Sequence, residues 1–170
     1  MSDYIKEFTF KEPPKELNYL EGEPLKLNEE FKFYHNKLKF RREINQLQYL
    51  FQDYMKITLQ APGIRDTYLK KLYTDSFFLV IFTDLETIKE TNRIIEQHLD
   101  LSIEKGCYYI ETTSEYMLLL TKDLDSIKAG TKTMKNILDQ VLHEYFLVQK
   151  DFDKFIKIRP FRLYSCSPSS

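Results

Sequence analysis

The residues best suited to metal binding or nucleophilic catalysis are three histidines and two cysteines. His35, His98 and His143 fall in different predicted elements and show no i, i+4 pairing. A metal site needs clustered ligands, so we expect none here. Cys107 would need a nearby histidine to act as a nucleophile, and the sequence suggests none. We therefore expect Cys107 to be a small core residue of a strand, and we expect no metal or other cofactor.

The acidic residues offer a second kind of chemistry. Asp123 and Asp125 are close enough in sequence to be imagined as the two carboxylates of a glycosidase. They come directly before an apolar helical stripe, where an aspartate accepts a hydrogen bond from a free N–H of the first turn. We expect both to be caps or solvated turn residues. The nucleophile-elbow, phosphate-loop and zinc-protease motifs are all missing from the sequence.

Two basic clusters, at 37–42 and 150–162, include aromatic residues. Phe40, Phe155 and Phe161 could stack on bases in a protein that binds single-stranded nucleic acid. The whole chain, however, has 25 Lys and Arg against 26 Asp and Glu, for a net charge of −1. A chain with almost no net charge is not attracted as a whole to nucleic acid or to an anionic membrane, so we expect neither as a partner.

The length of 170 residues suits one domain with its own core. The first ten residues lack the basic and apolar segments of a secretory signal, and no run approaches about 18 consecutive apolar residues. The two cysteines, Cys107 and Cys166, lie far apart in the sequence. We therefore expect reduced thiols rather than a disulfide, and a cytoplasmic location.

Hydrophobic periodicity predicts strands that alternate with helices. The predicted strands are 24–27, 31–34, 77–82, 107–110, 116–120 and 155–158. The strands at 107–110 and 116–120 are expected to form a hairpin. The unbroken apolar run at 77–82 indicates a strand covered on both faces.

Apolar spacings of three and four predict three helices. The first begins near Leu38, the second follows a capping box at Thr83–Glu86, and the third follows Asp123 or Asp125. Gly130 inside the third helix costs about 1 kcal/mol relative to alanine, so we expect close packing of that helix on the sheet.

The predicted fold is α+β or mixed α/β, a two-layer sandwich in which a mixed β-sheet carries two to three helices mainly on one face. The predicted core is Ile44, Leu47, Phe51, Phe78, Val80, Phe82, Ile110, Leu118, Leu120, Ile127, Met134, Leu138 and Val141.

Three segments share a pattern with a known domain. Residues 12–27 form a proline–lysine segment, a glycine turn and a strand. Residues 109–138 form a hairpin and a helix, with Gly130 placed before the stretch Thr133–Leu138. Residues 155–161 form a last strand. In this order the segments resemble the non-catalytic N-terminal domain of family twenty glycoside hydrolases, the β-N-acetylhexosaminidases.

The resemblance covers residues 12–162 and implies a domain layout. We expect an N-terminal extension at 1–11, a single hexosaminidase N-terminal-like domain at 12–162 and a flexible tail at 163–170. In that family a catalytic (β/α)₈ barrel with a His-x-Gly-Gly-Asp-Glu signature follows. The signature is absent, and a barrel needs about 250 residues. No catalytic residue of the family therefore transfers to this chain.

The resemblance implies a non-catalytic accessory, or scaffolding, domain of a β-N-acetylhexosaminidase-like glycoside hydrolase, or a stand-alone relative with no activity of its own. We expect this chain alone not to be an enzyme. One alternative is an independent module that binds a protein or a carbohydrate. Another is a small enzyme whose site is not recognised.

The family also implies a partner, because its N-terminal domain packs against the barrel and the chain leaves by the last strand. We expect as partner a glycosidase catalytic barrel, in the same or a separate chain, or a second copy of this chain. Exposed apolar patches often mark such contacts. The candidate interaction surface is Tyr145, Phe146, Phe152, Phe155, Phe161 and Tyr164. The alternative is that these rings cap the domain's own core.

Overall fold

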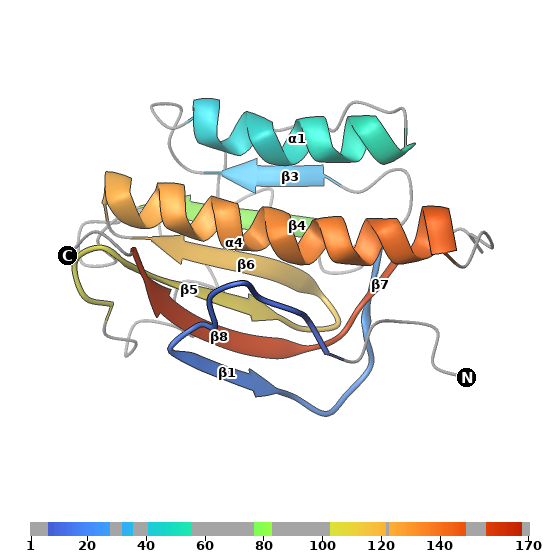
Figure 1. Cartoon of the computed structure of the whole chain (residues 1–170), viewed down its shortest axis with the longest axis horizontal. Helices are drawn as coiled ribbons and strands as arrows, with labels where there is room; N and C mark the ends of the chain where they lie inside the picture. Colours follow the sequence, from blue (N-terminus) through green and yellow to red (C-terminus); the bar gives the residue numbers. More distant parts are fainter. Residues whose placement is uncertain are drawn as a thin grey trace.

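The protein is a two-layer α+β domain in which two helices lie on one face of a mixed sheet (Figure 1). The computed structural model describes residues 7–27, 32–35, 41–55, 77–82, 103–121, 123–148 and 156–167. The predicted fold class is confirmed. The second predicted helix, after Thr83–Glu86, lies outside the described residues.

The described strands are β1 (Glu16–Tyr19), β2 (Leu25–Leu27), β3 (Lys32–His35), β4 (Phe77–Phe82), β5 (Cys107–Thr112), β6 (Tyr116–Thr121), β7 (Ile156–Ile158) and β8 (Phe161–Cys166). Six of them form one sheet in the order β1-β8-β5-β6-β4-β3. The β3–β4 and β4–β6 pairs are parallel, and the other pairs are antiparallel. Strands β2 and β7 form a separate antiparallel pair. The predicted hairpin is β5–β6.

The two described α-helices are α1 (Arg41–Met55) and α4 (Leu124–His143), and α4 continues into a π-helical turn, η3 (Glu144–Val148). Helix α1 packs against α4, and α4 packs against β5 and β6. Neither helix, within the described part of the chain, is long and apolar enough to cross a lipid bilayer.

Helix α4 begins as the sequence predicts, with Asp123 as its N-cap. The Asp123 carboxylate accepts a hydrogen bond from the Ser126 N–H at 2.8 Å, and the Ser126 hydroxyl accepts one from the Asp123 N–H at 2.9 Å. This reciprocal pair satisfies two donors at the start of the helix. Asp125 lies exposed in the first turn, as expected for a solvated residue.

Gly130 lies where α4 packs closely on the sheet, which confirms the predicted reason for a glycine there. A Cβ atom at this position would lie 2.8 Å from Leu119 Cδ1 and 3.2 Å from Tyr108 Cγ. Both side chains are buried in the sheet. A larger residue would therefore push α4 away from β5 and β6.

Every predicted core residue whose side chain is described is buried. Those between the helices and the sheet are Leu47, Ile110, Ile127, Met134, Leu138 and Val141. Leu118 and Leu120 are also buried, but they lie opposite Glu111 and Tyr109 in the β5–β6 register and so lie on the other face of the sheet. The side chains of Ile44, Phe51, Phe78, Val80 and Phe82 lie outside the described part.

Strand β8 corrects the prediction of a flexible tail at 163–170. Residues 161–166 pair with β1 on one side and with β5 on the other, so β8 is an interior strand of the sheet. Phe161, Leu163 and Ser165 are buried and alternate with more exposed residues, which is the pattern of a strand. Pro160 ends β7, but the chain then turns and enters the sheet again.

The domain boundary at residue 12 also needs correction. The segment that we expected to be an extension includes Phe8, which is buried and belongs to the core cluster. Residues 7–10, the described end of that segment, are therefore part of the domain.

Candidate functional site

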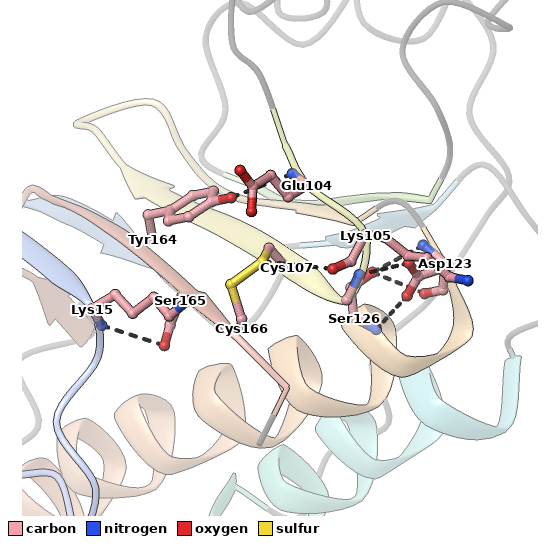
Figure 2. Close-up of a disulfide and its surroundings, with 10 residues drawn as sticks. Lys15, Glu104, Lys105, Cys107, Asp123, Ser126, Tyr164, Ser165 and Cys166 are labelled. Atoms are coloured by element: carbon pink, nitrogen blue, oxygen red, sulfur yellow. Dashed lines mark hydrogen bonds between the residues drawn. A yellow bond between two sulfur atoms is a disulfide. The ribbon is translucent and has the colours of Figure 1, made fainter. Parts of the chain in front are cut away.

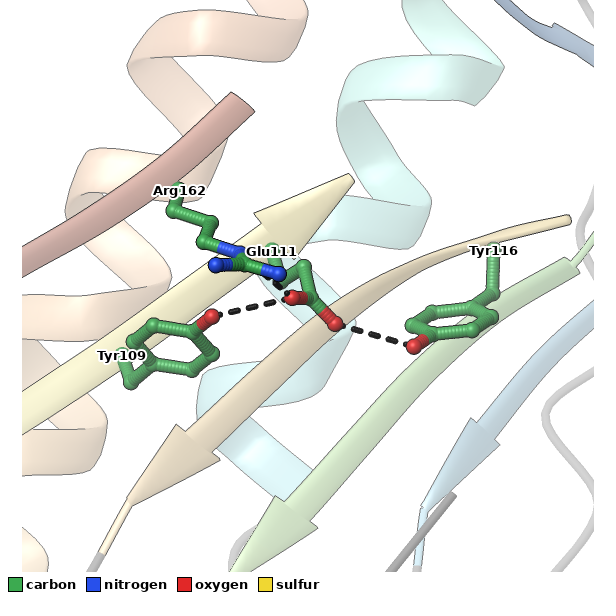
Figure 3. A network of polar contacts seen from close by, with 4 residues as sticks. All are labelled: Tyr109, Glu111, Tyr116 and Arg162. Carbon is green, nitrogen blue, oxygen red and sulfur yellow. Dashed lines mark hydrogen bonds and ion pairs between the residues drawn. The ribbon is translucent and has the colours of Figure 1, made fainter. Parts of the chain in front are cut away.

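A buried carboxylate lies on the face of the sheet opposite α4, which we call the second face (Figure 3). Glu111 of β5 accepts hydrogen bonds from the Tyr109 hydroxyl at 3.0 Å and from the Tyr116 hydroxyl at 2.9 Å. The Arg162 Nε on β8 donates to the same carboxylate at 3.1 Å. We call these four residues the Glu111 cluster.

Strand geometry explains how the sequence brings the Glu111 cluster together. Side chains alternate between the faces of a strand, so Tyr109 and Glu111 share the second face while Tyr108 and Ile110 face α4. Arg162 is directly opposite Glu111 in the β5–β8 register. Tyr116 reaches Glu111 diagonally from β6, within the range of a long aromatic side chain.

The Glu111 cluster satisfies a charge that would otherwise be costly to bury. Glu111 is only 5% exposed, and an isolated buried carboxylate is strongly unfavourable. Two phenol hydroxyls and one guanidinium donate to its two oxygens. Burial raises the pKa of Tyr109 and of Tyr116, and the neighbouring Glu111 charge raises both further. Both phenols therefore stay protonated as donors.

This arrangement favours a structural role for Glu111 over an acid–base role. A general acid or base must come within hydrogen-bond reach of a substrate. Both carboxylate oxygens of Glu111 already accept bonds, from residues of β5, β6 and β8. The Arg162 side chain is 57% exposed, so it is the member of the cluster with the most access to solvent.

We expect the raised tyrosine pKa values to make the protein sensitive to alkali. Above about pH 10 a tyrosine ionises in the unfolded chain but stays protonated in the fold, so the unfolded state gains stability. The loss should approach about 1.4 kcal/mol per pH unit for each of Tyr109 and Tyr116. Urea unfolding measured from neutral pH upward checks this. The Tyr109→Phe/Tyr116→Phe double variant should show a shallower decline, and an unchanged slope would contradict the prediction.

A disulfide joins two strands on the same face (Figure 2). Cys107 of β5 lies directly opposite Cys166 of β8, with their Cα atoms 3.8 Å apart. The Ser167 N–H donates to the Gly106 carbonyl at 2.8 Å, so the cysteines occupy a non-hydrogen-bonded pair, where facing side chains are closest. The prediction of reduced thiols is wrong. The two cysteines are 59 residues apart in the sequence, but the pairing of β8 with β5 brings them together in space.

The turn before the disulfide is tied to the start of α4. Gly106 has φ of +79°, a left-handed conformation that favours glycine, and its N–H donates to the Asp123 carboxylate at 2.7 Å. Burial tends to raise the pKa of Asp123, but the bonds from the Ser126 and Gly106 N–H groups outweigh it and lower that pKa. Asp123 is thus an ionised structural carboxylate that holds the helix start against the Gly106 turn (Figure 2).

The disulfide is directly measurable. The chain has two cysteines in total, so a denatured but unreduced sample should contain no thiol that reacts with Ellman's reagent. The same sample after reduction should yield two thiols per chain. Two reactive thiols without reduction, in protein purified with thiols blocked at lysis, would contradict the Cys107–Cys166 bond.

The six aromatic residues of the predicted interaction surface do not form one exposed patch among the described residues. Tyr145 and Phe161 are buried in the core, as the alternative interpretation expected, and so cannot belong to an exposed patch. Phe146 is partly buried against the same core, and Tyr164 is partly buried with its hydroxyl accepting a bond from the Glu104 N–H at 3.3 Å. Phe152 and Phe155 lie outside the described residues.

The histidines do not meet in the described structure. His143 is exposed in the last turn of α4, the side chain of His35 is outside the described part, and so is all of His98. Among the described residues, no three His, Cys, Asp or Glu side chains are grouped so that they could hold a metal ion.

The Glu111 cluster was missed by sequence reasoning, because Glu111 was assigned to the loop of the predicted hairpin. The structure extends β5 to Thr112, which places Glu111 inside the strand. The available signal was the alternation of Tyr109 and Glu111, which continues the strand pattern. Arg162 could not be assigned to the cluster without knowing that β8 is a strand.

Several solved structures contain a similar fold. CpGH84D superposes with a TM-score of 0.59 at 10% identity, over 95% of this chain and 24% of that one. The GH20 exo-β-N-acetylglucosaminidase of Vibrio harveyi gives 0.54 at 11% identity, over 90% of this chain and 18% of that one. The GH20 β-N-acetylhexosaminidase of Streptomyces coelicolor A3(2) gives 0.53 at 8% identity, over 88% and 25%.

The chain has the fold of a partial domain of GH84 and GH20 hexosaminidases. It spans about a quarter or less of the length of these structures. The resemblance predicted from the sequence is confirmed at the level of fold. No protein-family model and no curated protein matches the sequence.

Proposed function

We propose that this chain is a non-catalytic accessory domain of a β-N-acetylhexosaminidase-like glycoside hydrolase, and that it works packed against a catalytic barrel in the same or a separate chain. One observation carries the proposal. The fold of nearly the whole chain, 95% and 90% of it, matches only 24% of CpGH84D and 18% of the Vibrio harveyi enzyme. Most of each of those structures has no counterpart in this chain.

The roles of Asp123 and Glu111 support the proposal. A glycoside hydrolase needs at least one carboxylic acid that reaches the glycosidic oxygen from an open substrate site. Asp123 caps α4 and holds the Gly106 turn, and Glu111 ties three strands from a buried position. Each is committed to a structural task.

An activity assay of the purified chain tests the proposal. We expect no turnover of a nitrophenyl N-acetyl-β-glucosaminide above the buffer rate. The Asp123→Asn and Asp125→Asn variants serve as controls for a contaminating enzyme. Turnover that is lost in either variant would overturn our interpretation of Asp123 as a cap and of Asp125 as a solvated residue. Turnover that persists through rigorous purification in both variants would equally overturn the proposal, since the chain would then have a catalytic site elsewhere.

The cytoplasmic location stays a prediction, and the Cys107–Cys166 disulfide weighs against it. Structural disulfides persist mainly in oxidising compartments. The thiol measurement proposed above, made on protein from the native source, tests this point.

A further inference from the structure

The first described residues lie on the domain as a separate strap, residues 7–10 (Figure 1, dark blue). The Thr9 N–H donates to Gln140 Oε1 at 2.8 Å, and Gln140 Nε2 donates to the Thr9 carbonyl at 2.7 Å. One side-chain amide of α4 therefore bonds both backbone groups of a strap residue. A neighbouring β-strand would bond them in the same way.

The strap also fills an aromatic pocket. Phe8 is buried, and its ring centroid lies 5.2 Å from that of Phe161, edge-on, and 6.0 Å from that of Tyr19. The Phe8 N–H donates to the Tyr19 hydroxyl at 2.8 Å. Tyr19 is itself held by Arg159, whose guanidinium lies 4.2 Å from the ring centroid. The pocket is built from β1, β8 and the segment that joins β7 to β8.

These contacts recognise a general kind of ligand. The polar bonds go to backbone groups of the strap, and the Thr9 side chain itself is exposed. The apolar contacts select an aromatic side chain at one position, while Phe10 is partly buried against the core. Peptide-binding proteins combine the same two features, backbone hydrogen bonds for affinity and a side-chain pocket for specificity.

The connection between the strap and the sheet favours release. Residues 11–13 are exposed, and Pro13 and Pro14 have no backbone N–H to donate. Phe8 is the one buried side chain among residues 7–13, so opening of the strap should cost less than unfolding of the core. Opening would expose the pocket beside Tyr19 and Phe161 together with the Gln140 amide.

We propose that Gln140, Tyr19 and Phe161 form a peptide-binding site, occupied here by the chain's own strap, that takes an extended peptide with an aromatic residue when the strap leaves. The proposal is independent of the accessory-domain function. It can be tested on the full chain with a fluorescein-labelled peptide that has the sequence of residues 5–12.

Two variants open the site in different ways. Phe8→Ala empties the pocket, and Thr9→Pro removes the N–H that bonds Gln140. Thr9→Ala is the matched control, because it changes an exposed side chain and leaves the backbone bonds in place. In the wild type the tethered strap competes at an effective concentration on the order of millimolar. We therefore expect the labelled peptide to bind both opened chains at least tenfold more tightly than it binds the wild type or Thr9→Ala.

Two further changes test the contacts themselves. Adding Gln140→Ala to the Phe8→Ala chain should weaken peptide binding roughly fivefold or more, since two hydrogen bonds are lost. Replacing the phenylalanine of the peptide that corresponds to Phe8 by alanine should abolish binding. Far-UV circular dichroism and a cooperative melt establish that each variant is folded.

Three results would overturn the proposal. Folded Phe8→Ala and Thr9→Pro chains that fail to bind the peptide would overturn the proposal. So would binding that is insensitive to Gln140→Ala or to loss of the peptide's phenylalanine. If both variants fail to fold, the strap is an integral part of the core rather than an exchangeable ligand, and the proposal is likewise overturned.

Discussion

Phe161→Ala is expected to destabilise the domain by about 3–5 kcal/mol, the usual cost of removing a fully buried aromatic ring. Phe161 has no exposed surface, lies on an interior strand and contacts the ring of Phe8. Its removal would leave a cavity between the helices and the sheet. Urea denaturation followed by circular dichroism measures the free energy of unfolding directly.

Tyr49→Ala is the control for Phe161→Ala. Tyr49 is also an aromatic residue, but it is 59% exposed on α1, so its loss should change stability by about 0.5 kcal/mol or less. A loss below about 1 kcal/mol for Phe161→Ala would contradict its place in the core. It would also return Phe161 to the exposed surface that the sequence suggested.

Glu111→Ala is the second change for which we expect a large effect, about 2–5 kcal/mol of lost stability, because two buried phenol hydroxyls lose their acceptor. The buried Glu111 carboxylate accepts hydrogen bonds from the Tyr109 and Tyr116 hydroxyls and forms an ion pair with Arg162. The substitution removes all three interactions. Hydrogen bonds to a charged group contribute about 1.5–3 kcal/mol each. Urea denaturation again gives the measurement.

The order of effects within the Glu111 cluster is more informative than any single value. Arg162→Ala should cost about 1–3 kcal/mol, since the guanidinium is 57% exposed but its loss leaves the buried Glu111 carboxylate with only phenol donors. Glu16→Ala, an exposed carboxylate on β1, should be nearly neutral. A neutral Glu111→Ala would contradict the structural role of the cluster.

Features governed by local rules could be predicted from the sequence. The Asp123 cap follows from residues three positions apart, and the hairpin follows from two apolar runs around a short loop. The close approach at Gly130 was predictable, because a glycine inside a helix costs stability and close packing against the sheet is a reason for that cost to be tolerated.

Features that depend on long-range pairing could not be predicted. Strand β8 follows Pro160 and leads into a Ser- and Pro-rich end, so its local sequence suggested a stop and a tail. Once β8 is placed between β1 and β5, the Cys107–Cys166 disulfide and the Glu111–Arg162 ion pair both follow from the register. The bond between Thr9 and Gln140 spans 131 residues and has no local signal at all.

The proposed accessory role is tested most directly by immunodepletion with an antibody raised against this chain. Extract from the source cell would be depleted and then assayed with a nitrophenyl N-acetyl-β-glucosaminide. This design works whether the catalytic barrel lies in the same chain or in a separate one. Pre-immune antibody serves as the control. We predict that β-N-acetylhexosaminidase activity leaves the extract with this domain and is recovered on the beads, whereas activity that stays wholly in the depleted extract would contradict the proposal.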